Sequence, residues 1–406
     1  MEGFYIENAR LSCCIAPPVP VPPVEPEPEP DPDPLLLRIL TNNAGASLPW
    51  ADQTEFEAAM ASDNPSLSVS SYSLVGNELT VMGTGLVKMP DGELSFIAEI
   101  IEVESETIEE TGVSSFSSCT SLTSVDFPNV TTIGIDGFSS CVGLTEATFP
   151  LATGVGDNAF KDCSSLDTAY FPLLTSLSEG VFYGTALETA SFPEVVTIGK
   201  EAFSGCDNLT SVSFPKATFI GESAFYSNYG LTSVTFPLVE ETDVSAFSSC
   251  IYLATVSFPA LETVGNTTFD ETAIVAVNTT NFPSVTYWGD EALKNCTSLE
   301  TFETNASVVR PDVLSNCTAL IDVTLNNATA LFDIFGSNAY LDSKAVNNMT
   351  FSMPNLNNII NNPFADIISN GIIGGGTDFT ITIPSAMGAA TRITEAQSAG
   401  AIIVTV

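Results

Sequence analysis

The amino-acid sequence predicts a mainly β solenoid of 22-residue coils, preceded by an amino-terminal cap and an extended proline-rich stalk. The first observation is a recurring Phe-Pro pair, whose phenylalanines are Phe127, Phe149, Phe171, Phe192, Phe214, Phe236, Phe258 and Phe282. The second is another phenylalanine about eleven residues before each pair, at Phe116, Phe138, Phe160, Phe182, Phe203, Phe225, Phe247 and Phe269. The third is composition, because Thr, Ser, Val and Phe alternate and long Ala/Glu/Lys/Leu stretches are missing, which favours strands over helices.

The part of the chain before Leu35 divides into two segments. Residues 1–16 form a short head that contains Phe4, Tyr5 and Ile6 and lacks the basic and apolar regions of a conventional secretory signal. Residues 17–34 hold ten prolines, alternating with acidic residues from Glu25 to Asp33, which predicts an extended polyproline-type spacer. An apolar peptide on a semi-rigid spacer favours an anchor that docks into a partner, and a disordered tail is the alternative.

The rest of the chain divides into three regions. Residues 35–93 are irregular and are predicted to cap the solenoid, because an open end would expose apolar core and unpaired strand edges. A short helix is expected at Thr54–Met60, and strands are expected at Ser68–Leu74 and Glu78–Val81. Residues 94–330 carry the regular repeats, and residues 331–406 carry degenerate repeats and a carboxy-terminal cap.

One coil begins at Gly134, and its pattern generalises as G-x-x-[AG]-F-x-x-C-x-x-L-x-x-V-x-F-P-x-V-x-x-I. Leu144, Ala147 and Phe149 alternate as in a strand, so they are expected to face the core while the residues between them face outward. Proline cannot donate a hydrogen bond to a β ladder. Pro150 and its equivalents are therefore expected to end the strand at the same place in every coil.

A repeat period of 22 residues, combined with L-x-x-L-x-L spacing, is typical of leucine-rich repeats. The Ala-Phe-x-x-Cys-x-x-Leu-x-x-Val-x-Phe-Pro unit resembles the BspA-like class of these repeats, and the resemblance covers roughly 70% of the chain. It implies a right-handed leucine-rich-repeat solenoid with strands on one face. The resemblance also implies a role in adhesion and partner binding rather than in catalysis. The proline-rich stalk and the lack of an export signal depart from the secreted members.

The charge balance excludes several kinds of partner. The chain has 49 acidic and 10 basic residues, no histidine and a formal net charge of −39. Phosphate binding needs clustered Lys and Arg, so no nucleic-acid partner is expected. No apolar stretch reaches the length of a membrane span, so no membrane insertion is expected. Solubility in a saline environment accounts for the acidity, and cation binding is the alternative, although no calcium-loop motif is present.

The same composition argues against catalysis. Without histidine there is no Ser-His-Asp or Cys-His arrangement and no histidine metal site. Acidic pairs such as Glu109-Glu110 and Glu240-Glu241 are interpreted as solvated surface groups. The sequence therefore predicts a protein that is not an enzyme and that uses no cofactor and no metal.

Seven of the nine cysteines occupy one repeat position, and Gly184 and Asn228 are expected to fill it in other coils. The seven are Cys119, Cys141, Cys163, Cys206, Cys250, Cys296 and Cys317. A position that tolerates Gly and Asn argues against a disulfide framework. We therefore predict buried free thiols that pack as small apolar residues.

The predicted binding surface is the outward face of the strands. One outward column consists of Asp126, Thr148, Tyr170, Ser191, Ser213, Thr235 and Ser257. A parallel column consists of Ser124, Glu146, Thr168, Thr189, Ser211, Ser233 and Thr255. Tyr170, and the pair Tyr287 and Trp288 in an unusual coil, are the aromatic residues most typical of a binding hot spot. The alternative is that Ser and Thr simply suit exposed strand positions.

The leading hypothesis is a fibre or appendage on the virion surface of a phage-like virus. Its solenoid would engage a protein or carbohydrate on a host or environmental surface, and its head peptide would dock on a virion or assembly protein. An adhesin-type repeat without an export signal motivates this hypothesis, because virions assemble inside the cell. The alternatives are a bacterial cell-surface adhesin, extracellular or on the cell surface, and an ice-binding solenoid. A homo-oligomer is possible in each case.

Overall fold

The computed structural model describes residues 35–41, 50–75, 78–92, 94, 100–327, 330–331, 334, 348–352, 379–383 and 402–405. The predicted head peptide with Phe4, Tyr5 and Ile6 and the predicted proline-rich spacer lie outside the described residues. Most of the region predicted to carry degenerate repeats and a carboxy-terminal cap, residues 331–406, also lies outside them.

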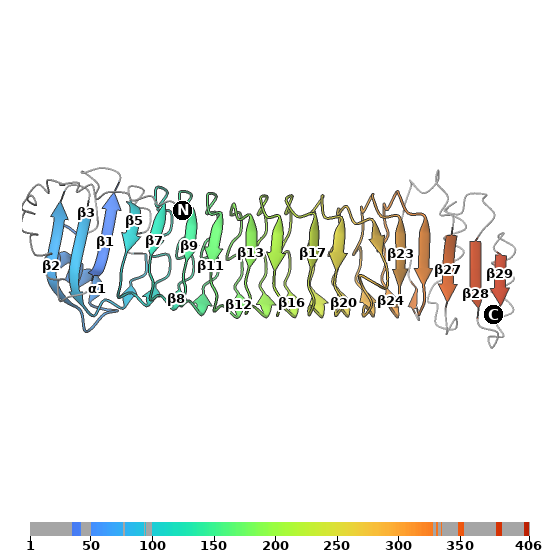
Figure 1. Cartoon of the computed structure of the whole chain (residues 1–406), viewed down its shortest axis with the longest axis horizontal. Helices are drawn as coiled ribbons and strands as arrows, with labels where there is room; N and C mark the ends of the chain where they lie inside the picture. The colour runs from blue at the N-terminus through green and yellow to red at the C-terminus, as the bar shows by residue number, and fades with distance from the viewer. Residues whose placement is uncertain are drawn as a thin grey trace, which may run out of the picture. The chain divides into compact units, whose positions relative to one another are not determined.

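The chain after residue 34 begins with a five-stranded sheet and a short helix. The sheet has the order β2-β3-β1-β5-β7, with antiparallel pairs β2/β3, β3/β1 and β1/β5 and a parallel pair β5/β7. Its first elements are β1 (Leu35–Thr41), α1 (Gln53–Met60), β2 (Ser68–Val75) and β3 (Glu78–Thr84). The helix and the two strands predicted here are thus confirmed. The sheet changes from antiparallel to parallel at β5, where the coils begin (Figure 1).

Helix α1 begins at a capping box. The carboxylate of Asp52 accepts a hydrogen bond from Glu55 N at 3.0 Å, and the carboxylate of Glu55 accepts one from Ala51 N at 2.7 Å. These bonds satisfy backbone donors that the helix itself leaves unpaired. Phe56 packs against Trp50 in a T-shaped contact of 5.0 Å and against Tyr72 of β2 at 6.4 Å, so the helix lies against this strand.

Each coil contributes strands to two faces. The long-strand face consists of β5 (Ile100–Glu104), β7 (Ser124–Asp126), β9 (Glu146–Thr148), β11 (Thr168–Tyr170), β13 (Thr189–Ser191), β15 (Ser211–Ser213), β17 (Ser233–Thr235), β19 (Thr255–Ser257), β21 (Ala276–Val277), β23 (Thr301–Thr304) and β25 (Asp322–Leu325). The parallel ladder of β21, β23 and β25 continues through β27 (Asn348–Ser352), β28 (Phe379–Ile383) and β29 (Ile402–Thr405).

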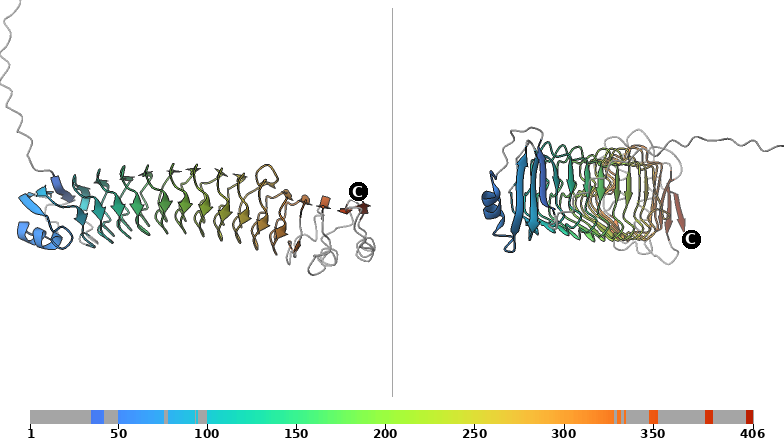
Figure 2. Two further views of the ribbon diagram at one scale, coloured as in Figure 1. Left: turned by 90° about the horizontal axis from the view of Figure 1, so that it is seen from below. Right: turned by 60° about the vertical axis from the view of Figure 1, so that its left-hand side comes forward.

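The short-strand face consists of two-residue strands. They are β4 (Lys88–Met89), β6 (Glu110–Thr111), β8 (Thr132–Ile133), β10 (Gly154–Val155), β12 (Ser176–Leu177), β14 (Thr197–Ile198), β16 (Phe219–Ile220), β18 (Glu241–Thr242), β20 (Thr263–Val264), β22 (Tyr287–Trp288), β24 (Val308–Val309) and β26 (Ala330–Leu331). The family resemblance implied strands on one face only. This expectation is wrong, because the structure has strands on two faces (Figure 2). The mainly β solenoid itself is confirmed.

Consecutive coils are held in parallel register by their backbones. Thr168 pairs with Glu146, one regular period earlier, whereas Thr197 pairs with Ser176, which makes that coil one residue shorter. The turn segment on the third side of the coil forms a further ladder, in which Phe116 N donates to Gly137 O and Phe138 N donates to Ala159 O, both at 2.8 Å. Backbone polar groups are thus satisfied by the neighbouring coil on all three sides.

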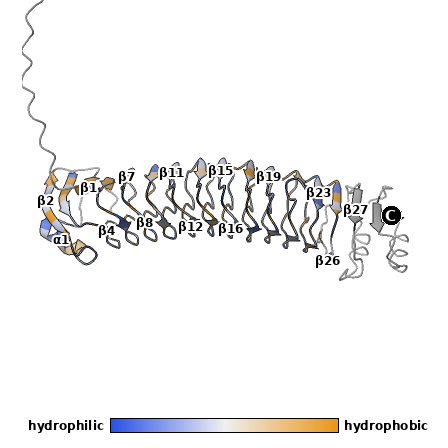
Figure 3. Cartoon of the chain, turned by 60° about the horizontal axis from the view of Figure 1, so that its bottom comes forward, coloured by the Kyte–Doolittle hydropathy of each residue, from blue (hydrophilic) through white to orange (hydrophobic). Residues whose placement is uncertain are grey.

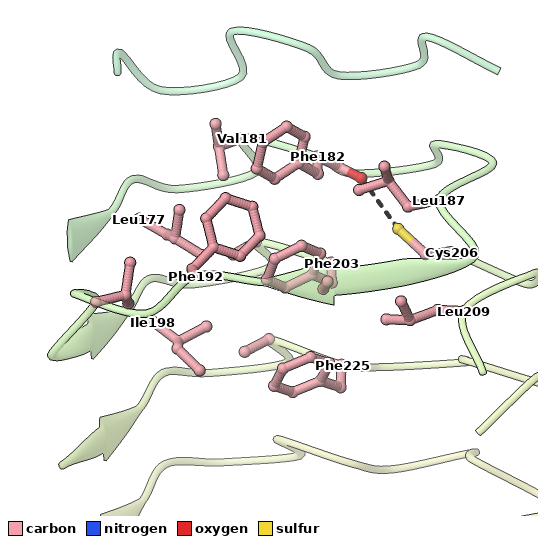
Figure 4. Close-up of a cluster of buried hydrophobic side chains, with 14 of the residues drawn as sticks. Leu177, Val181, Phe182, Leu187, Phe192, Ile198, Phe203, Cys206, Leu209 and Phe225 are labelled. Carbon is pink, nitrogen blue, oxygen red and sulfur yellow. Dashed lines mark hydrogen bonds between the residues drawn. The ribbon is translucent and has the colours of Figure 1, made fainter. Parts of the chain in front are cut away.

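The core contains two columns of stacked phenylalanines. In the first column, which runs from Phe116 to Phe269, neighbouring rings lie 5.0 to 5.6 Å apart and within 17° of parallel. The Phe-Pro phenylalanines form the second column, and both columns are buried (Figure 4). Fully burying one such ring stabilises the fold by roughly 1.5 to 3 kcal/mol. The columns therefore account for much of the cohesion between coils.

The predicted alternation of inward and outward residues is confirmed. Leu144, Ala147 and Phe149 are fully buried, whereas Glu146 is exposed and Thr148 is half-buried. Apolar and polar stretches recur from coil to coil (Figure 3). The strand ends at Thr148, directly before the Phe-Pro pair, in line with the prediction that proline closes it.

Two positions in each coil adopt a left-handed backbone. They lie two residues before and two residues after the first-column phenylalanine, as at Asp136 (φ 52°) and Ser140 (φ 60°) around Phe138. Short polar side chains tolerate this conformation better than bulky ones because they can hydrogen-bond locally. This requirement explains why Ser, Asp, Asn and Gly dominate these positions.

The seven described cysteines are buried free thiols, as predicted. Each thiol donates a hydrogen bond to a main-chain carbonyl of the coil before it, as Cys141 Sγ does to Phe116 O at 3.0 Å and Cys250 Sγ does to Phe225 O at 3.0 Å. Asn228 fills the same position, and its Nδ2 donates to Phe203 O at 3.0 Å. The position therefore selects a small buried donor rather than a disulfide.

The expectation that Gly184 fills the cysteine position is wrong. The structure places Thr185 there, and its Oγ1 donates to Phe182 O at 3.0 Å and lies 3.3 Å from Cys206 Sγ. The coil is one residue shorter than the regular period, so counting back one regular period from Cys206 arrives one residue early. Thr272 fills the position in a later coil and contacts Cys296 Sγ at 3.2 Å.

A glycine follows most of the short strands, although Ser178, Asp243 and Arg310 stand at this corner in other coils. A Cβ atom at Gly134 would lie 2.2 Å from Gly112 O, and one at Gly156 would lie 2.4 Å from Ile135 N. These contacts are with backbone, which cannot move without breaking the ladder. The glycines of the repeat therefore allow the coils to approach one another at this corner.

We predict that Gly134→Ala destabilises the protein by about 2 to 4 kcal/mol, because the new methyl group overlaps the preceding coil. Gly154→Ala is the matched control in the next coil, since the nearest atom to its Cβ would be Thr132 Cγ2 at an ordinary 3.5 Å. Equilibrium unfolding in denaturant should leave the control within about 1 kcal/mol of the wild type. Equal losses in the two variants would contradict the close-approach argument.

We also predict that stability falls as the pH rises from about 9 to 12. Burial raises the pKa of Cys163, Cys250 and Cys296 to about 12, whereas thiols of the unfolded chain ionise near pH 8.5. The unfolded chain therefore binds fewer protons than the folded chain in this window, so rising pH favours unfolding. Each buried thiol contributes a slope of up to about 1.4 kcal/mol per pH unit.

The matched variant is Cys250→Asn, which removes one titrating group and keeps a donor of the kind that Asn228 provides. Its free energy of unfolding, measured in denaturant at a series of alkaline pH values, should fall less steeply than that of the wild type. An unchanged slope would show that Cys250 does not titrate between the two states.

Candidate binding surface

The first predicted column lies at the outward position of the long-strand face. Asp126, Tyr170, Ser191, Ser213 and Thr235 are exposed there, and Thr148 and Ser257 are half-buried. Neighbouring members stand in register, since Tyr170 pairs with Thr148, Ser191 with Ser213, and Thr235 with Ser257. The structure thus brings the column together as a row of side chains on one face, and its role in binding stays a prediction.

The second column runs beside the first and is exposed at every position. It consists of Ser124, Glu146, Thr168, Thr189, Ser211, Ser233 and Thr255. Thr148 Oγ1 donates a hydrogen bond to the carboxylate of Glu146 at 2.6 Å, which links the two columns. The face is therefore polar and rich in hydroxyl groups, and Tyr170 is its large aromatic side chain, with 52% of its surface exposed.

The prediction that Tyr287 and Trp288 belong to this surface is wrong. Both residues form β22, which pairs with β20 and β24 on the short-strand face. Trp288 is fully buried, makes T-shaped contacts of 5.4 Å with Phe282 and Phe302, and donates from Nε1 to Thr304 Oγ1 at 3.0 Å. It occupies the core position that neighbouring coils fill with a smaller residue, such as Val264 or Val309.

Sequence reasoning missed a second group of exposed aromatic residues. Tyr226, Tyr229, Ile251 and Tyr252 come from two neighbouring coils and are 41%, 43%, 43% and 59% exposed. We call these four residues the tyrosine patch. Tyr229 and Ile251 directly follow the buried Asn228 and Cys250, at the turn that leads toward the long-strand face. The position after the cysteine is Thr120, Ser164 or Asp207 in other coils, so a large residue there was the available signal.

Charge on the surface is mostly acidic and only locally compensated. Lys200 lies 3.6 to 4.0 Å from the carboxylates of Glu179, Glu201 and Glu222, which come from three consecutive coils. Lys216 and Glu194 form another pair between neighbouring coils. Exposed ion pairs of this kind contribute about 0 to 1 kcal/mol each. They offset repulsion between coils without changing the acidic character of the surface.

The described part of the chain offers few groups for chemistry. It contains no group of three or more Cys, Asp or Glu side chains placed to hold a metal ion. None of its helices is long and apolar enough to cross a membrane. The buried cysteines are held as neutral thiols, since burial raises the pKa of Cys206 to about 11 and that of Cys250 to about 12.

Three bacterial proteins of known structure are among those that resemble this chain, each at low sequence identity. A leucine-rich repeat protein from Bacteroides ovatus shares 17% identity over 84% of this chain and 99% of its own, with a TM-score of 0.44. A leucine-rich cell surface protein from Faecalibacterium prausnitzii shares 19% identity over 82% and 89%, with a TM-score of 0.38. The pneumococcal vaccine antigen PcpA shares 12% identity over 83% and 87%, with a TM-score of 0.43.

None of the curated proteins matches the chain. The model of the BspA type leucine-rich repeat region matches six copies, over residues 96–197, 175–300 and 246–370. These matches cover more than half of the sequence and follow the coils that the structure shows. The chain therefore belongs to the BspA-type leucine-rich-repeat family.

Proposed function

We propose that this chain is a non-enzymatic binding protein that attaches to a protein or carbohydrate surface through the long-strand face and the tyrosine patch. The observation that carries the proposal is the long-strand face itself, where outward Ser and Thr side chains repeat in register from coil to coil. Many weak contacts spaced along a rigid surface add up to firm attachment.

The exposed tyrosines supply the strongest individual contacts of this surface. A tyrosine combines a large apolar ring with a hydroxyl group, and such residues are enriched among binding hot spots. Tyr170 and Tyr252 are the most exposed of them, at 52% and 59%. We propose that they anchor the partner while the surrounding hydroxyls align it.

The charge of the chain limits the partner. With a net charge of −39, the surface repels nucleic acids and strongly anionic glycans. Neutral glycans, amino sugars and basic protein surfaces are the partners that fit. The ice-binding alternative is not carried forward, because the outward positions hold Asp, Glu, Ser and Tyr among the Thr residues rather than a regular Thr-x-Thr ladder.

We further propose that the protein is attached to a virus particle. An apolar head and a proline-rich spacer before the solenoid suit a virion fibre whose residues 1–16 dock on another virion protein. The alternative is a bacterial cell-surface adhesin, whose solenoid would work in the same way. Both place the protein at a surface, so the proposed binding mode does not depend on which carrier is correct.

We expect Tyr170→Ala combined with Tyr252→Ala to weaken binding at least about tenfold, which is the loss of a typical hot spot. The probes are an array of neutral, amino and anionic glycans and a panel of intact bacterial cells. Leu151→Ala combined with Leu173→Ala is the matched control, because these two side chains are each 44% exposed at another corner of the solenoid. Equal binding by both double variants would reject the proposed surface.

Trp288→Ala should behave differently from the tyrosine variants. Its removal leaves a cavity between Phe282 and Phe302, so we expect a loss of about 3 to 5 kcal/mol in the free energy of unfolding. Thermal unfolding followed by circular dichroism separates this effect from a loss of binding. If the Trp288→Ala protein stays stably folded but binds more weakly, Trp288 contacts the partner and its role is not only structural.

Fractionation of the organism that makes the protein shows whether the protein is attached to virus particles or to the cell envelope. Quantitative mass spectrometry should find multiple copies on purified virus particles if the virion proposal is correct. Enrichment in the cell-envelope fraction, with none on particles, would instead support the adhesin.

A further inference from the structure

The five-stranded sheet at the start of the described chain ends in an unusual edge. β2 is the outermost strand of this sheet, and among the described residues no strand pairs with its other side. Its sequence, Ser-Val-Ser-Ser-Tyr-Ser-Leu-Val, contains no charged residue, no proline and no glycine. Each of the four other strands in the sheet carries a charge, among them Arg38 in β1 and Glu78 in β3.

This distribution is the reverse of the usual one. Natural proteins place charges, prolines or bulges on edge strands, because an uncharged edge with free N–H and C=O groups pairs with other strands. In a chain with 49 acidic residues, an uncharged run at the edge stands out. The strand has a register shift between Val69 and Ser71, but the residues after the shift keep regular pairing with β3.

The side chains of β2 also lack cover. Leu74 is 47% exposed and Val75 is 72% exposed, at the end of the strand away from the register shift. On the side facing α1, Tyr72 is held by a hydrogen bond from its hydroxyl to Trp50 O at 2.9 Å. Gln53 Nε2 donates to Val69 O at 3.2 Å, and the ring of Phe56 lies 6.4 Å from that of Tyr72, whereas Leu74 and Val75 beyond these contacts stay exposed.

We propose that the edge of β2 pairs in antiparallel fashion with β2 of a second copy of this chain. Antiparallel pairing of the regular residues 71–75 of both copies, with Ser73 opposite Ser73, places Tyr72 of one copy opposite Leu74 of the other, which covers the exposed leucine. The pairing is isologous, so it uses both free edges at once and closes at a dimer. It joins two five-stranded sheets into one continuous sheet.

The chemistry of the edge favours a second copy over other occupants. Residues 17–34 hold ten prolines, which have no N–H group to donate to a ladder, so that segment makes a poor strand partner. A highly charged peptide of another protein finds no opposite charge within β2. A second β2 offers an uncharged strand of the same length with hydroxyl and apolar side chains to match.

Sedimentation velocity of the full chain from about 1 to 100 μM should reveal a dimer with a micromolar dissociation constant. Added NaCl should tighten it, because both copies carry a net charge of −39 that salt screens. A monomer throughout this range, or a dimer that salt dissociates, would overturn the proposal.

The decisive variant is Ser71→Glu combined with Ser73→Glu, which restores charge to the edge and should weaken the dimer at least about tenfold. Ser211→Glu combined with Ser233→Glu is the matched control, since these serines are equally exposed but lie in β15 and β17 inside the solenoid. Equal weakening of both would show that added charge alone acts, which would refute edge pairing.

Hydrogen exchange locates the contact. Some amides of residues 71–75 already donate to β3, and those that face away from β3 should exchange more slowly as the protein concentration rises through the dissociation constant. Slow exchange at the lowest concentration would mean that another segment of the same chain occupies the edge, and the second-copy proposal would fail. Neither result depends on the binding function proposed for the solenoid, because the β2 edge lies outside that surface.

Discussion

The structure depends on one constraint, which is that each coil must present its backbone N–H and C=O groups in register to the coil before it. Parallel ladders run along the long-strand face, the short-strand face and the turn segment, so a coil that differs in length must absorb the difference between ladders. The coil before Tyr287 shows how, because Tyr287 pairs with Thr263, whereas a regular period would pair it with Gly265. Its extra residues form a local turn in which Asn281 Nδ2 donates to Ala276 O.

Because the coils are in register, residues at the same repeat position of successive coils stack into a column. The phenylalanines stack because every coil places its ring at the same height and angle, and the cysteine position repeats because every coil offers the same carbonyl to a buried donor. Substituting Asn or Thr at that position is tolerated where the replacement still reaches a carbonyl of the stack. We therefore expect functional residues at the outward positions, because neither core packing nor the backbone ladder restricts the side chain there.

Much of the core could be predicted from the sequence, because the inward positions repeat with a fixed period and a fixed chemistry. The burial of Phe149, the exposure of Glu146 and the free thiol of Cys250 all followed from that pattern. The binding surface was predicted less well. Trp288 looked like an exposed hot spot because its coil has an unusual length, and the tyrosine patch was overlooked because its residues lie in turns, where alternation does not indicate direction.

The sequence alone thus determined the 22-residue period, the two phenylalanine columns, the Phe-Pro pair that follows the long strands of the regular coils and the membership of the BspA-type family. These features are local, since each coil carries its own copy of the signal. Only the tertiary structure decided that strands form on two faces, that Trp288 is buried between Phe282 and Phe302, and that among the described strands β2 lies at the uncharged edge of its sheet. Those outcomes depend on which segments become neighbours, and neighbours are fixed by stacking rather than by any one coil.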